Sequence, residues 1–224
     1  MSNAQAWPPA TGLTTKVVAR KDAILQLSSA TTVGAPAALV FDTVLCVGKY
    51  PEWNTWVPSA RIQTQPPSSD AQRGPDDLNY MRIGSIMTFD VVMDASKPKK
   101  FNHTTLQVLD ICTPNAQTRY LTSDMLADPT FTADLSRVYR VSWTGHGGTS
   151  SFGMMKLERF HEVLVLNDKE CEVRTWELMS GPLSRVVKLL YEQTLEEKLG
   201  VWCADLKKYC EKTHAAGLDR SLTV

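Results

Sequence analysis

The chain has 224 residues, of which 43% are apolar, and its 24 basic residues cancel its 24 acidic ones. A chain of this length and composition can bury one sizeable core, so a single domain is expected. The balanced charge, without a long run of Lys or Arg, argues against nucleic acid or an anionic membrane surface as a partner.

The N-terminus and the apolar runs indicate a cytoplasmic protein. The stretch MSNAQAWPPATG lacks the basic start and the apolar core of a secretory signal. No apolar run approaches the roughly 20 residues that a membrane-spanning helix needs, so stable membrane insertion is not expected. These patterns do not indicate an oligomeric state.

The sequence lacks the motifs of several common kinds of site, including disulfide frameworks, metal sites and phosphate-binding loops. The five cysteines are scattered and include no CxxC pair, which argues against a disulfide framework and a structural zinc site. The four histidines show no HExxH or other paired-ligand spacing, so neither a metal nor another cofactor is predicted. The GHGG stretch at 145–148 lacks the Lys-Ser/Thr of a phosphate-binding loop, and residues 146–153 are expected to form a flexible hairpin loop.

The N-terminal part of the chain predicts a strand followed by two short helices. Residues 1–20, rich in Pro, Thr and Ala, are expected to form an extension outside the core. Residues 22–31 begin with an apolar run and predict the first strand. Residues 36–46 predict a short helix with a proline at its start, and Gly48 is expected to end it. KYPEWN, at 49–54, is expected to add one or two further helical turns.

The middle of the chain predicts six further strands in succession. Short connections between consecutive strands indicate an antiparallel sheet. Two longer segments, residues 65–82 and 113–136, are expected to be lids, binding loops or mobile segments. The predicted strands are residues 57–64, 85–94, 103–112, 137–144, 157–167 and 171–179.

The C-terminal region carries the clearest helical pattern. After Gly181, Pro182 opens a segment in which apolar residues recur at steps of three or four, from Leu183 to Tyr209. This stripe predicts a helix of about 30 residues, roughly 45 Å long, and only a broad sheet could cover it along its length. The domain is therefore assigned to residues 21–213, followed by a C-terminal tail at 214–224.

A succession of motifs spans nearly all of residues 22–213: KYPEWNTWVPSARI, RIGSIMTFDVVM, LERFHEV, TWELMSGPLSRVVKLL and WCADLKKYCE. With these motifs in this order, the sequence resembles the SRPBCC or START-like helix-grip superfamily. That superfamily contains START lipid-transfer domains, birch-pollen-allergen-like proteins, coenzyme-Q-binding proteins and polyketide cyclase/dehydrase families. The resemblance implies an α+β fold in which a seven-stranded curved antiparallel sheet grips the long helix, with two short helices after the first strand. It also implies an internal cavity, but the fold hosts carriers, receptors and enzymes alike.

The strands at 157–167 and 171–179 carry the strongest candidates for chemistry. His161 alternates with Arg159 on one face of the first, and Glu177 lies on the second. If His161 and Glu177 point into the cavity, an imidazole and a carboxylate could transfer protons on an enolisable substrate. The alternative is a cross-strand pair on the solvent face, and alternation does not choose between them because both faces carry apolar groups.

Aromatic residues are predicted to shape the pocket. Tyr139, the third predicted catalytic residue, shares a strand face with Trp143, and its hydroxyl could orient a ligand. The alternative for both is ordinary core packing. In KYPEWNTWV, at 49–57, the two tryptophans are expected to anchor a corner beside the cavity mouth. The residues predicted to contact the ligand are Trp53, Trp56, Phe89, His103, Trp143, Arg159, Trp176 and Tyr191.

Two functions from different classes fit these features. The first is a cofactor-independent cyclase, dehydratase or isomerase that acts on a polyketide- or terpenoid-like metabolite of secondary metabolism. The second is a non-catalytic carrier or binding protein for a lipid, sterol or quinone. Titratable groups that converge inside the cavity would favour the enzyme, and an entirely apolar lining would favour the carrier.

Overall fold

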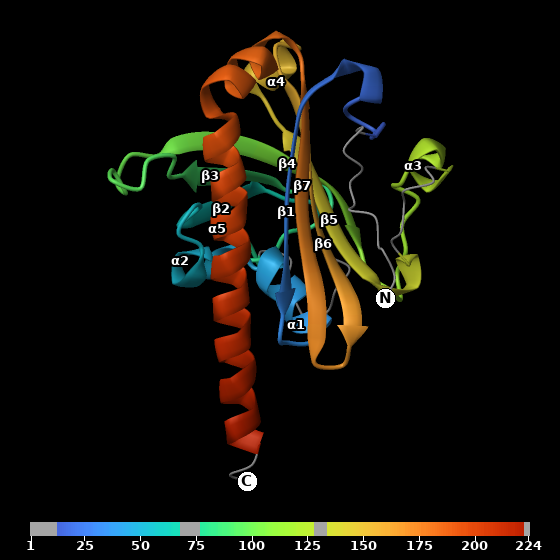
Figure 1. Cartoon of the computed structure of the whole chain (residues 1–224), viewed down its shortest axis with the longest axis vertical. Coiled ribbons are helices and arrows are strands. Elements are labelled where there is room, and N and C mark those ends of the chain that lie inside the picture. Colours follow the sequence, from blue (N-terminus) through green and yellow to red (C-terminus); the bar gives the residue numbers. More distant parts are fainter. Residues whose placement is uncertain (1–12, 68–76, 128–133, 222–224) are drawn as a thin grey trace.

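The computed structural model of the protein describes residues 13–67, 77–127 and 134–221. These residues form a seven-stranded antiparallel sheet with the strand order β1-β7-β6-β5-β4-β3-β2. The sheet curves around one long helix, α5, which confirms the predicted helix-grip architecture (Figure 1). The strands are β1 (Ala23–Val33), β2 (Ser59–Thr64), β3 (Ile86–Val91), β4 (Asn102–Cys112), β5 (Val138–Gly145), β6 (Lys156–Asn167) and β7 (Glu170–Ser180).

Helix α5 (Pro182–Ser221) has 40 residues and is longer than the predicted helix, because it continues into the segment assigned to a C-terminal tail. The predicted stripe is buried only from the fourth turn onward. There the side chains of Leu195, Leu199, Trp202, Leu206 and Cys210 pack in the core. Nearer the start of the helix, Tyr191 of the same stripe is 45% exposed. The sheet therefore covers the middle of α5 more closely than its first turns.

Two short helices close one end of the space between α5 and the sheet (Figure 1). They are α1 (Ala37–Leu45) and α2 (Tyr50–Trp53), joined by a 3-10 turn at Val47–Lys49. Gly48 lies in this turn, so α1 ends slightly earlier than predicted. The Tyr50 hydroxyl donates a hydrogen bond to the Val44 carbonyl, with 2.9 Å between the oxygens, which ties the two helices together.

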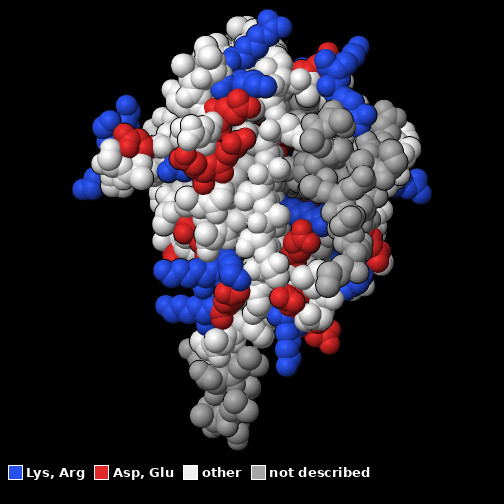
Figure 2. All heavy atoms as spheres, in the orientation of Figure 1, with Lys and Arg blue, Asp and Glu red and all other residues white. Residues whose placement is uncertain are grey.

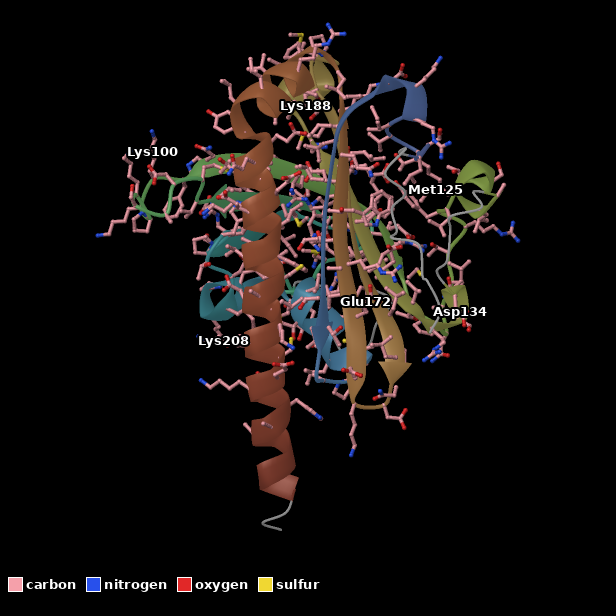
Figure 3. The ribbon with its side chains drawn as sticks, in the orientation of Figure 1. Lys100, Met125, Asp134, Glu172, Lys188 and Lys208 are labelled. Atoms are coloured by element: carbon pink, nitrogen blue, oxygen red, sulfur yellow. The ribbon has the colours of Figure 1, made fainter. Side chains whose placement is uncertain are left out.

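The core continues on the opposite face of the sheet, inside the predicted N-terminal extension. Leu13 and Val18 are each 1% exposed and pack with Phe160 and Trp176, which point outward from β6 and β7. Met125 of α3 (Ser123–Ala127) joins this outer cluster, on the side of the sheet away from α5 (Figure 3). The outer faces of β6 and β7 are apolar and gain stability from this cover.

The remaining connections carry short helical turns. These are 3-10 turns at Arg20–Asp22 and Leu135–Arg137, and α4 (Gly148–Ser151) inside the predicted hairpin loop. Parts of the two predicted long loops, residues 68–76 and 128–133, lie outside the described residues. Within the described part of the chain, no helix is long and apolar enough to cross a membrane. Lys and Arg are interspersed with Asp and Glu on the visible face (Figure 2), in keeping with the balanced charge.

Candidate functional site

A cavity of about 330 Å³ lies between the inner face of the sheet and the first half of α5. Its walls are mostly apolar and come from every layer of the grip: Phe89 of β3, Leu106 of β4, Trp143 of β5, Met179 of β7 and Leu195 of α5. This volume lies at the lower end of the range that small-molecule sites usually occupy. The space is therefore suited to a compact, mainly apolar molecule.

Arg159 of β6 and Glu177 of β7 form an ion pair, and both side chains line the cavity. The two residues are direct cross-strand partners, and the Arg159 Nε and Nη2 groups both contact Glu177 Oε2. Their side chains are 13% and 3% exposed, respectively. The Arg159 guanidinium carbon also lies 4.8 Å from the centroid of the Trp56 ring, a cation–π contact. Arg159 and Glu177 are the charged residues among the described residues that line the cavity.

His161 lies two residues after Arg159 in β6, on the same face of the strand. Its imidazole is 1% exposed and is held between two indoles, with ring centroids 4.5 Å from Trp143 and 4.3 Å from Trp202. Neither ring nitrogen has a hydrogen-bond partner among the described residues, and neither does the hydroxyl of Thr175, which faces His161 on β7. Burial, and to a lesser extent the Arg159 charge, hold the pKa of His161 well below its usual value. The imidazole is therefore neutral at physiological pH.

The register decides which of the predicted residues reach the cavity. Residues 157, 159 and 161 of β6 share the inner face with residues 175, 177 and 179 of β7. Sequence alternation grouped these residues correctly but could not say that their face was the inner one. Of the predicted site residues, those that line the cavity are Trp56, Phe89, Trp143, Arg159, Glu177 and Tyr191.

Three predicted residues lie on the inner side of the sheet without lining the cavity. His161 is covered by Trp143 and Trp202, as described above. Tyr139 packs against Phe41 of α1, with ring centroids 5.3 Å apart. Trp53 packs against Tyr50 and Trp202 and anchors its corner of the fold. These three side chains are not among the described residues that line the cavity.

Two residues predicted to contact the ligand have side chains on the outer face of the sheet, away from the cavity. Trp176 stacks on Phe160, with ring centroids 4.0 Å apart, in the outer cluster, and its indole donates to Glu162. The side chain of His103 is 66% exposed, and its Nδ1 lies 2.7 Å from Asp90 Oδ1. Each residue is one position out of phase with the cavity-lining residues of its strand, and a shift of one residue reverses the face.

The Asp90 carboxylate also belongs to this outer face. Burial raises its pKa, but hydrogen bonds from Arg61 and His103 outweigh that effect and lower the pKa to about 2. Asp90 is therefore ionised at neutral pH and holds the outer ends of β2, β3 and β4 together.

The sequence did not predict several of the residues that line the cavity. Met93, Asn102, Met155 and Val187 line it together with Tyr191 of α5. Asn102 belongs to the same face as Thr104 and Leu106, so correct phasing of β4 would have identified it. Met93 and Met155 lie outside the strands, where alternation gives no signal. Among the described residues, no three His, Cys, Asp or Glu side chains are grouped so that they could hold a metal ion.

The curved sheet, the long helix that it grips and the cavity between them define a protein with the helix-grip fold of START-like proteins. No protein-family model matches the sequence. Among curated proteins, the chain is 25% identical to the oxopyrrolidines biosynthesis cluster protein O of Penicillium oxalicum, over 89% of this chain and 93% of the relative.

Solved structures share the fold at low sequence identity. A START superfamily protein from Mycobacterium smegmatis superposes with a TM-score of 0.51 at 13% identity, over 84% of this chain and 98% of that chain. The di-domain ARO/CYC BexL from the BE-7585A biosynthetic pathway superposes with a TM-score of 0.50 at 9% identity, over 82% of this chain and 47% of that chain. These similarities establish the fold of the present chain.

Proposed function

We propose that the protein binds a hydrophobic small molecule in the cavity and promotes its cyclisation, dehydration or isomerisation without a cofactor. The substrate would be a polyketide- or terpenoid-like metabolite. The observation that carries this proposal is the Arg159–Glu177 pair, which places a cation and a carboxylate on the wall of an otherwise apolar cavity. Buried ion pairs contribute little net stability, so an apolar pair would serve the fold equally well.

In this proposal, the two side chains have separate roles. Glu177 takes a proton from the carbon next to a ligand carbonyl, and the electron pair of the broken C–H bond forms the carbon–carbon double bond of an enolate. Arg159 stabilises the negative charge that develops on the carbonyl oxygen. The proton on Glu177 then passes to the product, or to a hydroxyl that leaves as water. Trp143 and Phe89 hold the ligand in shape for the reaction.

His161 and Tyr139 take no direct part in this scheme, in contrast to the sequence-based hypothesis. His161 packs against Trp143 and Trp202 and is not among the described residues that line the cavity, so its proposed role is to support these indoles. Tyr139 is packed beneath α1. The remaining acid–base candidate on the cavity wall is therefore Glu177.

The comparisons support a place in secondary metabolism. The curated relative belongs by name to a biosynthesis cluster, and the BexL structure comes from a biosynthetic pathway. At these identities, such likenesses suggest a class of metabolite and leave the reaction to experiment.

Ligand extraction and native mass spectrometry of the purified protein provide the first test. The proposal expects a bound hydrophobic metabolite in the wild type and its loss when Val91→Trp and Leu106→Trp together fill the cavity. Once the metabolite is identified, Glu177→Gln is expected to lower turnover at least about 100-fold, because general-base catalysis typically contributes that much. Turnover by Glu177→Gln at the wild-type rate would rule out the proposed role of this carboxylate.

The alternative is a carrier without catalytic activity, and the mostly apolar lining favours it. In that case, the extracted molecule would be a lipid, sterol or quinone that the protein returns unchanged after incubation. Glu177→Gln would then alter affinity without altering any product.

A further inference from the structure

A second pocket, the junction pocket, lies where β7 leads into α5. Its volume is about 500 Å³, and none of the described residues lines both this pocket and the apolar cavity. Lys156 and Ser180 line the junction pocket, whereas their neighbours Leu157 and Met179 line the apolar cavity. Successive side chains of a strand point to opposite faces, so the two pockets lie on opposite sides of β6 and β7.

Positive charge prevails in the junction pocket. Its described lining includes Lys21, Lys156 and Arg185 but a single carboxylate, that of Asp22. Within the described part of the chain, these four side chains form no salt bridge. Like charges in one pocket repel each other, and an anion bound there would be attracted by all three cations. The pocket therefore favours an anion, although the charge of the whole chain is balanced.

A buried hydroxyl adds a neutral donor to these cations. Ser180 is 5% exposed and lines the pocket, and its Oγ has no hydrogen-bond partner among the described residues. Its cross-strand partner in β6 is Lys156. The Cβ atoms of such partners lie about 4.5–5.5 Å apart, so the hydroxyl and the ammonium group belong to one side of the sheet and one site. Buried hydroxyls are normally hydrogen-bonded, which points to a ligand atom as the partner of Ser180.

The backbone at the start of α5 does not supply these donors. Pro182 has no N–H, and the N–H of Leu183 donates to the Met154 carbonyl at 3.0 Å. The N–H of Ser184 donates to the Gly181 carbonyl, also at 3.0 Å. Recognition in the junction pocket therefore depends on its side chains.

We propose that the junction pocket binds a phosphate group carried by a metabolite or a lipid. A phosphate monoester has a charge of about −1.5 to −2 at neutral pH and three acceptor oxygens, which match the excess positive charge and the several donors. Arg185 can donate two parallel hydrogen bonds, and Lys21 and Lys156 act as point charges. A carboxylate has half the charge and one oxygen fewer. The pocket volume also leaves room for the molecule that carries the phosphate.

This inference goes beyond the function proposed for the apolar cavity and does not depend on what that cavity holds. The phosphate has two possible sources. Phe152, next to Gly153 of the pocket lining, is 83% exposed and would suit the acyl part of a lipid. A soluble phosphate ester needs only the pocket itself. The experiment therefore tests the phosphate first and its source second.

A titration of the full-length protein labelled with nitrogen-15 tests the phosphate site. Inorganic phosphate, pyrophosphate and acetate are added at constant ionic strength, because general screening would otherwise move many signals. Saturable shifts are expected at the amides of Gly153 and Gly181, which line the pocket. Pyrophosphate should bind at least about tenfold more tightly than acetate, since one further hydrogen bond to a charged group is worth that much. Equal responses to the two, or shifts that do not saturate, would overturn the proposal.

Two variants separate a specific site from a general attraction to surface charge. Ser180→Ala leaves the charge unchanged and is expected to weaken pyrophosphate binding about fivefold, as the loss of one hydrogen bond does. Lys156→Gln with Arg185→Gln should weaken it at least about tenfold. The matched control is Lys208→Gln with Lys212→Gln, two exposed positions much further along α5, where Figure 3 labels Lys208. Affinity that falls as much in the control, or that ignores Ser180→Ala, would contradict the assignment.

Vesicles identify the source of the phosphate. Flotation compares vesicles of phosphatidylcholine alone with vesicles that also contain phosphatidic acid. Binding that requires phosphatidic acid, is displaced by pyrophosphate and falls in Phe152→Ser supports a lipid phosphate. Saturable pyrophosphate binding without vesicle binding supports a soluble phosphate ester. Absence of both kinds of binding in the wild type would overturn the phosphate site.

Discussion

The imidazole of His161 lies 4.3 Å, centroid to centroid, from the indole of Trp202, and this contact joins the centre of the sheet to the middle of α5. Trp202 in turn packs against Trp53 at 5.8 Å, so the contact also links α2 to the grip. A neutral ring without hydrogen-bond partners thus lies at the junction of three elements.

Protonation of His161 is expected to destabilise the fold. Its pKa is lowered in the folded state, so the unfolded chain binds a proton more readily, and the contribution of His161 to stability falls as pH drops below about 6.5. His161→Leu should remove that part of the pH dependence. Urea unfolding of both proteins at pH 5.5 and 7.5 measures it, and parallel pH profiles would contradict the expectation.

Glu158→Gln is expected to change how the free energy of unfolding depends on pH. Glu158 is fully buried, and its carboxylate accepts hydrogen bonds from the Tyr120 hydroxyl and the Val17 backbone N–H. Burial raises the pKa of Glu158. The folded protein therefore holds the proton more tightly than the unfolded chain, and wild-type stability falls as pH rises from about 4.3 through the folded pKa.

Glutamine cannot ionise, so the variant should gain stability relative to the wild type between pH 4 and pH 8, by at most about 1.4 kcal/mol per pH unit. The measurement is the difference in unfolding free energy between the variant and the wild type at several pH values across this range. A difference that stays constant with pH would show that Glu158 does not titrate in this way.

Leu13→Ala tests whether the N-terminal segment belongs to the folded domain. Leu13 is 1% exposed against the outer face of the sheet, so its truncation should cost about 2–5 kcal/mol. Leu189→Ala is the matched control, because Leu189 is 83% exposed and should change stability by less than about 0.5 kcal/mol. Thermal unfolding of the three proteins compares them, and equal midpoints for Leu13→Ala and the wild type would exclude a structural role for this segment.

Gly181→Ala should be destabilising at the junction of β7 and α5. Gly181 has a φ of 96°, and an added Cβ would lie 2.7 Å from the Met154 carbonyl oxygen. The strained backbone alone costs about 1–3 kcal/mol. Gly200→Ala within α5 meets no atom within 4 Å and should instead be stabilising by about 0.5–1 kcal/mol. Opposite shifts in the unfolding midpoint are expected, and a stable Gly181→Ala variant would refute the clash.

The sequence by itself determined the order of elements, and with it the architecture. The helical spacing from Leu195 to Cys210 required a broad apolar partner, and the six successive strands supplied it. Alternation also paired Arg159 with His161 on one face of β6. These features are local, because periodicity within one element depends only on neighbours along the chain.

Only the tertiary structure decided which face of each strand points inward. Both faces of β6 and β7 carry apolar residues, so alternation does not show which face is the inner one. Phe160 and Trp176 lie on the outer face, where Leu13, Val18 and Met125 cover them. Arg159 and Glu177 lie on the inner face and line the cavity. The N-terminal stretch carries no periodic signal of this cover, so the sequence alone does not show that Trp176 packs beneath it and away from the cavity. The distance between Arg159 and Glu177, and the burial of His161 between Trp143 and Trp202, depend on contacts between distant elements that no single stretch of sequence encodes.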